Sequence, residues 1–202
     1  MRRLAVSVFF LRWAAAVARA ACQKIPDLIA QLRPHPVERY FTRELIPLPF
    51  EELVSKATLI VEGTVRPIKT ALTEDQCYLY TDYEVSPRAI LFGKTPATKT
   101  PGPQPLVVRL IGGQTMIDGV KVIVRDEQLP PLDPGQHVML FLTTTEKTNI
   151  YEPVGGILGA FKLTAAGHIE SLVREKGIYE DVAALPKSAL ANEVKRIKSG
   201  GD

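Results

Sequence analysis

The sequence contains few of the residues that usually build metal sites and nucleophilic centres. It has three histidines and two cysteines among 202 residues. His35, His137 and His168 are too far apart for the short ligand spacing of a zinc site. No serine lies in a G-x-S-x-G nucleophile elbow. Residues 93–95 (Gly-Lys-Thr) resemble the end of a phosphate loop, but the first glycine is missing and a proline-rich loop follows. We therefore expect no catalytic residue, no metal site and no cofactor.

The first 20 residues resemble a cleavable export signal. Arg2 and Arg3 precede an apolar stretch, and Ala18-Arg19-Ala20 fits a small-x-small cleavage site. Arg12 interrupts the apolar stretch, which argues against a permanent transmembrane helix. We expect a secreted or periplasmic protein without a transmembrane anchor in the mature chain. An uncleaved N-terminal helix or a wrong start codon is the alternative.

Removing this leader changes the charge of the protein. The whole chain has a formal net charge of +3, with 25 basic and 22 acidic residues. Residues 1–20 contain four arginines and no acidic residue. The mature chain would therefore be close to neutral, and a nucleic-acid partner is not expected.

Cys22 and Cys77 are the two cysteines. In an oxidising compartment they could form a disulfide that ties the mature N-terminus to the middle of the chain. The alternatives are two free thiols, or the loss of Cys22 as part of a longer leader.

The middle of the chain reads as a series of β-strands separated by glycine and proline. Asp118-Gly119 lies between β-formers, which predicts a tight hairpin because both turn residues need a positive φ. Residues 138–143 are apolar on both faces, which predicts a central, covered strand. The predicted strands are 58–66, 78–85 with a continuation over 89–92 beyond a bulge at Ser86-Pro87, 106–111, 120–124, 138–143, 150–154 and 160–163.

Helical spacing predicts short helices over residues 26–32 and 50–56, with an extended connector over 37–49. A C-terminal amphipathic helix is expected to begin with Ser188 as its cap. The predicted organisation is a leader over 1–20, a helix and connector over 21–49, a β-domain over 50–165, and a C-terminal extension with a packing helix over 166–202.

Strand alternation also predicts a set of buried side chains and a polar face. Tyr80, Asp82 and Glu84 share one face of a strand, with the two carboxyl groups about 7 Å apart. This pair could bind a cation or serve in acid–base chemistry, and an exposed polar face is the alternative. Tyr78, Tyr80 and Tyr151 could form a stacking platform for single-stranded nucleic acid or sugar. This platform is disfavoured because the two acids beside Tyr80 would repel phosphates. The residues expected to be buried are Leu59, Val61, Tyr83, Val108, Val122, Leu140 and Phe161.

Several segments resemble, in their order, a bacterial exported domain of uncharacterised function. They are residues 57–65, 79–85 and 90–93, then Gly112-Gly113, Pro134-Gly135 with 139–142, and 151–161, so the likeness covers roughly residues 50–165. This resemblance implies an OB-like, five-stranded or slightly larger, antiparallel barrel. Together with the helices predicted from spacing, the expected fold is mainly β, with short N-terminal helices and a C-terminal amphipathic helix.

The strand segments are also distantly similar to netrin-like modules, which include tissue inhibitors of metalloproteinases. Inhibition in that family needs an N-terminal Cys-x-Cys, whereas this chain has only Cys22 there. No inhibitory residue is therefore assigned. We expect a non-enzymatic, exported binding module of the cell envelope with a protein or envelope-surface partner, for which Tyr80, Asp82 and Glu84 are weak binding candidates. The alternatives are a protease-inhibitor-type module and a hydrolase that uses the surface carboxylates.

Overall fold

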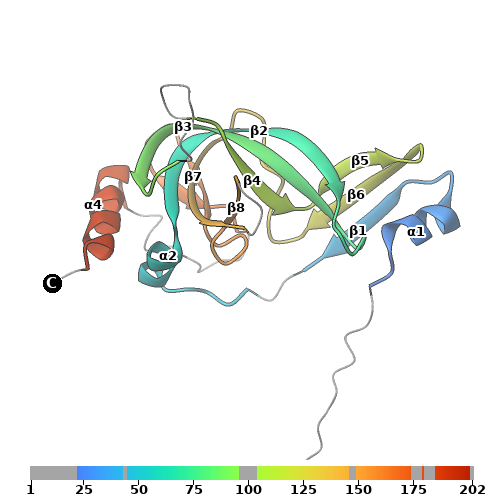
Figure 1. The fold of residues 1–202 in the computed structure, drawn as a ribbon, viewed down its shortest axis with the longest axis horizontal. Helices are drawn as coiled ribbons and strands as arrows, with labels where there is room; N and C mark the ends of the chain where they lie inside the picture. The colour runs from blue at the N-terminus through green and yellow to red at the C-terminus, as the bar shows by residue number, and fades with distance from the viewer. Residues whose placement is uncertain are drawn as a thin grey trace, which may run out of the picture.

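The protein is described from a computed structural model, which covers residues 22–42, 45–95, 104–145, 149–173, 179 and 185–200. The predicted leader lies outside the described residues. The fold is mainly β, as predicted, with two sheets and helices near both ends of the described chain (Figure 1). The elements are α1 (Ile25–Leu32), β1 (Val37–Phe41), α2 (Phe50–Lys56), β2 (Leu59–Leu72), β3 (Leu79–Phe92), β4 (Leu106–Ile111), β5 (Gly113–Ile117), β6 (Val120–Asp126), β7 (His137–Thr144), β8 (Ile150–Pro153), β9 (Ala160–Leu163), β10 (Ile169–Ser171) and α4 (Lys187–Lys198).

The larger sheet has the strand order β10-β9-β7-β2-β3-β4-β8. A further pairing joins β7 to β8, so hydrogen bonding runs from β7 through four strands and back to β7. The β4–β8 ladder is parallel and has two residue pairs, and the β7–β8 ladder has three. Because these ladders are short, the sheet is not a clear barrel. The expectation of a purely antiparallel sheet is wrong at the β4–β8 pair.

The smaller sheet has the order β1-β6-β5. Strands β5 and β6 form the hairpin predicted at Asp118-Gly119, where φ is +49° and +78°. Strand β1 pairs with β6 in parallel, with Val37 opposite Val122. The prediction of an extended connector over 37–49 is therefore wrong for the first five residues. Their partner lies 85 positions further along the chain, and a parallel pairing of this kind leaves little local signal.

Strands β2 and β3 are longer than predicted, because the hairpin that they form continues well beyond the hydrophobic core of the larger sheet. Pro67 lies inside β2 and would usually argue against a strand. However, β7 pairs with β2 only as far as Thr64, so the missing N–H of Pro67 interrupts no ladder with β7. The predicted interruption of β3 at Ser86-Pro87 is found as a register shift within one continuous strand, between Glu62 and Gly63 of β2.

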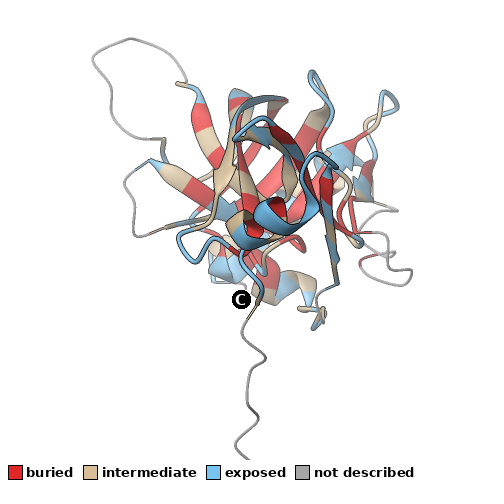
Figure 2. Cartoon of the chain, turned by 90° about the vertical axis from the view of Figure 1, so that its right-hand side faces the viewer, coloured by how far each residue is buried: buried red, intermediate tan, exposed pale blue. Residues whose placement is uncertain are grey.

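The core is organised around β7, which is buried on both faces from Val138 to Leu142. Figure 2 shows the buried residues gathered on the strands at the centre of the molecule. The main cluster joins the larger sheet to α2 and α4. A second, smaller cluster packs α1 and Leu79 of β3 against β1 and β6. All seven residues predicted to be buried are at most 5% exposed: Leu59, Val61, Tyr83, Val108, Val122, Leu140 and Phe161.

Helix α4 packs against α2 through its predicted apolar stripe. Leu190 and Val194 are fully buried. At the end of the helix, Lys198 Nζ donates to the carbonyl oxygens of Ser55 and Ala57, at 3.0 and 2.7 Å. The prediction of Ser188 as the N-cap is wrong. The helix begins at Lys187, and Pro186 takes the cap position.

Candidate binding groove between the two sheets

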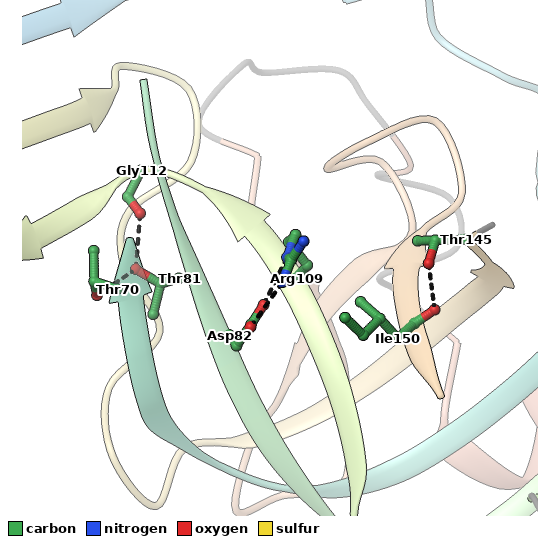
Figure 3. A network of polar contacts seen from close by, with 7 residues as sticks. All are labelled: Thr70, Thr81, Asp82, Arg109, Gly112, Thr145 and Ile150. Atoms are coloured by element: carbon green, nitrogen blue, oxygen red, sulfur yellow. Dashed lines mark hydrogen bonds and ion pairs between the residues drawn. The ribbon is translucent and has the colours of Figure 1, made fainter. Parts of the chain in front are cut away.

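The polar face predicted on β3 is an ion-paired surface. Asp82 lies opposite Arg109 of β4 in the ladder. Arg109 Nε and Nη2 donate to the two carboxylate oxygens of Asp82 at 2.7 and 2.9 Å (Figure 3). The same guanidinium lies over the ring of Tyr80, 3.7 Å from its centroid. Arg109 and Tyr80 together cover Asp82, which is 9% exposed.

The second carboxylate of this face has its own partner. Arg66 Nε donates to Glu84 Oε1 at 2.7 Å, and this hydrogen bond lowers the pKa of Glu84. Asp82 and Glu84 are therefore held by different arginines. This geometry does not resemble a catalytic carboxylate pair, in which one acid is kept protonated by its surroundings.

The three tyrosines considered as a stacking platform do not lie together. The ring of Tyr78 packs against Phe41, with centroids 5.1 Å apart. Tyr80 is covered by Arg109. Tyr151 is 6% exposed and belongs to the main core.

A buried charge cluster was not anticipated from the sequence. Glu62 of β2 is covered by β7 and the start of α4, and it is 4% exposed. His137 Nε2 lies 3.0 Å from Glu62 Oε1, and Lys187 Nζ is ion-paired with the other carboxylate oxygen. The cluster joins β2, β7 and the first residue of α4. Through the Lys187 ion pair it links the start of that helix to the sheet.

Cys22 and Cys77 are joined by a disulfide, with their Cα atoms 6.0 Å apart. Arg39 of β1 donates to the carbonyl oxygens of Cys77 and Gln23, one on each side of the bond. Cys77 lies in the turn between β2 and β3. The disulfide therefore fixes the N-terminal segment to the tip of the β2–β3 hairpin.

A groove of about 400 Å³ lies between the β2–β3 hairpin and the smaller sheet. One wall comes from β2 and β3, a second from β5 and β6, and a third from the segment between β6 and β7. The groove is open to solvent. Its apolar lining consists of Pro67, Tyr83, Ile123, Val124, Pro131 and Leu132.

Two hydroxyl groups, those of Thr70 and Thr81, line the inner part of the groove. Figure 3 shows them beside the carbonyl oxygen of Gly112. Thr81 is 3% exposed, and its Oγ1 donates to the carbonyl oxygen of Gly112 at 2.8 Å. Thr70 Oγ1 lies 3.0 Å from Thr81 Oγ1. Because a threonine has one hydroxyl proton and Thr81 gives its own to Gly112, Thr70 is the donor in this contact. Both hydroxyl protons are therefore used within the protein.

Gly113 allows the smaller sheet to start beside these threonines. Its φ is +129°, and a Cβ at this position would lie 2.1 Å from Thr81 Oγ1. Gly113 is thus a conformational requirement. It brings β5 close to the inner face of β2 and β3.

The remaining polar groups of the groove are the exposed Gln114 and Arg125. Among the eleven described lining residues, Arg125 is the one with a charged side chain. Tyr83 forms part of the wall, and burial raises the pKa of its hydroxyl group, which is hydrogen-bonded to the backbone of Leu132. The groove thus combines apolar walls with a polar rim.

A second hollow, of about 380 Å³, lies over Tyr80 and Arg109 beside the β2–β3 turn. Its arginine is already held by both oxygens of Asp82. Asp75, at its edge, accepts hydrogen bonds from Thr73 and from the backbone of Cys77, which lower its pKa. Arg109 and Asp75 are therefore already engaged by other groups of the protein, which makes the groove the better candidate site.

Sequence reasoning did not find the groove. The segments that line it lie far apart in the chain, and the strand predicted over 58–66 ended just before Pro67 and Thr70. Within the described ranges, no group of three or more His, Cys, Asp or Glu side chains is placed to hold a metal ion. None of the helices in the described part of the chain is long and apolar enough to cross a membrane.

Comparisons with protein-family models, with curated proteins and with solved structures found no match to this chain.

Proposed function

We propose that this protein is an exported, non-enzymatic binding module of the cell envelope, built on an OB-like barrel. The strand order that leads from β7 through β2, β3, β4 and β8 back to β7 supports a five-stranded, partly open barrel of the OB type. The Cys22–Cys77 disulfide supports an oxidising compartment, because such bonds persist outside the reducing cytosol.

The groove between the two sheets carries the proposal of binding. Its volume falls in the range of about 300–1,000 Å³ that is typical of small-ligand sites. Its walls are largely apolar and come mostly from strands, with a few polar groups at the rim and in the interior. This combination is the usual composition of a binding site, and the partner it would take is a component of the envelope.

Blocking the groove is expected to abolish binding. Gln114 is exposed and lines the groove, so Gln114→Trp should fill its mouth without disturbing the core. Met116 is 62% exposed and lies two positions further along the same strand, on the same face but outside the groove. Met116→Trp is therefore the matched control.

The measurement is capture from an envelope extract by the three immobilised proteins, followed by mass spectrometry of retained proteins and small molecules. We expect at least one component that the wild type and Met116→Trp retain and that Gln114→Trp loses at least 10-fold. Identical sets of retained components for all three proteins would contradict a binding role for the groove. Thermal melting of each variant confirms that the comparison is between folded proteins.

A further inference from the structure

The interior of the groove is suited to a hydrocarbon. Pro67, Ile123, Leu132 and the ring of Tyr83 supply apolar surface. A hydrocarbon placed against Thr70 and Thr81 would leave no hydroxyl proton without an acceptor, because both protons are already donated within the protein. An apolar ligand group therefore avoids the cost that an unsatisfied buried donor would impose.

The rim of the groove is suited to an anion. Arg125 carries the one charged side chain among the described lining residues, and its guanidinium can bind a planar carboxylate through two parallel hydrogen bonds. Gln114, also at the rim, can donate from its amide. None of the eleven described lining residues is acidic.

Acidic residues near Arg125 weaken its attraction for an anion. Arg125 lies opposite Tyr40 of β1, whose hydroxyl donates to Glu38 at 2.8 Å. Glu127 is also close to Tyr40, and Asp133 is close to Tyr83 on the other side of the groove. Because these groups and Arg125 are near solvent, binding of an anion should weaken as the salt concentration rises.

We propose that the groove binds a small amphiphile with a hydrocarbon body and a terminal carboxylate, as in a fatty acid. The hydrocarbon lies against Pro67, Tyr83 and Leu132, and the carboxylate pairs with Arg125. This assignment rests on the proposed function, since it names the ligand of the same groove.

The test uses isothermal titration calorimetry of the full mature chain with sodium octanoate and with 1-octanol, which has the same chain length but no charge. We expect octanoate to bind at least 10-fold more tightly than octanol. Arg125→Gln should remove this preference and leave octanol binding unchanged. Arg88→Gln changes an exposed arginine of β3 that does not line the groove, and it should keep the preference.

Two variants that block the groove test whether the ligands bind inside it. Gln114→Trp should abolish binding of both ligands, and Pro131→Trp, at an exposed position of the groove wall, provides the same block if the first variant does not fold. Equal affinities for octanoate and octanol in the wild type would overturn the carboxylate assignment while leaving the groove as a binding site. Binding of both ligands that neither block weakens would overturn the groove itself, and with it the proposed function.

A peptide carboxyl terminus shares the chemistry of an apolar carboxylate. An N-acetylated trileucine with a free carboxyl terminus therefore serves as a third ligand. Weaker binding than octanoate is expected. Binding at least 10-fold tighter than octanoate would assign the site to peptide termini and overturn the proposal of a small amphiphile.

Discussion

Replacing Phe141 by alanine is expected to lower the free energy of unfolding by about 3–5 kcal/mol. Phe141 is fully buried in the middle of β7. Its ring makes edge-to-face contacts with Phe50 of α2 and Phe161 of β9, with centroids 5.7 and 5.5 Å apart. The truncation would remove both contacts and leave a cavity that the strands around it are too rigid to fill.

Denaturant unfolding followed by circular dichroism measures this loss. Met116→Ala is the control, because an exposed side chain should change stability by no more than about 0.5 kcal/mol. Leu140→Ala tests the opposite face of the same strand and should cost about 2–5 kcal/mol. A loss below about 1 kcal/mol for either core variant would mean that β7 is not covered on that face.

Removing the disulfide is expected to have an effect of similar size. Cys22 and Cys77 are 55 positions apart, and closing a loop of that length in the unfolded chain corresponds to about 4 kcal/mol of stabilisation, within a typical range of about 2–4 kcal/mol for disulfides. The double variant Cys22→Ser, Cys77→Ser should therefore unfold at a clearly lower denaturant concentration than the wild type.

Reduction provides the control for this variant. A thiol reductant should lower the stability of the wild-type protein to that of the double variant and leave the variant unchanged. Equal stability of the oxidised and reduced wild type would show that the N-terminal segment contributes nothing by its attachment to the β2–β3 hairpin. The hairpin also forms one wall of the groove, and the disulfide holds the turn at the end of this hairpin.

Elements that a short stretch of sequence specifies could be predicted from that stretch alone. Asp118-Gly119 specifies its hairpin because the two turn residues need a positive φ, and these residues adopt it. The strand over 138–143 was assigned a central position from its two apolar faces, and β7 has three neighbouring strands. Helix α2 has the predicted bounds of 50–56.

Features that depend on distant partners were not predictable in the same way. β1 is a strand because β6 lies beside it, and the burial of Glu62 depends on the ion pair with Lys187 and on the nearby His137, both far from it in the sequence. Alternation alone places an acidic residue on the solvent face, so such a cluster is missed. The groove forms because the chain turns from β4 into β5 at Gly112 and β5 then crosses β3. No short segment of the sequence specifies this crossing.

Mapping the octanoate site by amide chemical shifts is the most direct test of the binding groove. In a titration of the isotopically labelled protein, we expect the largest shifts to fall on residues that line the groove: Thr70, Gly113, Gln114, Ile123 and Arg125. Shifts confined to the outer hollow around Tyr80 and Arg109, or spread over exposed apolar residues such as Ile68 and Met116, would contradict it.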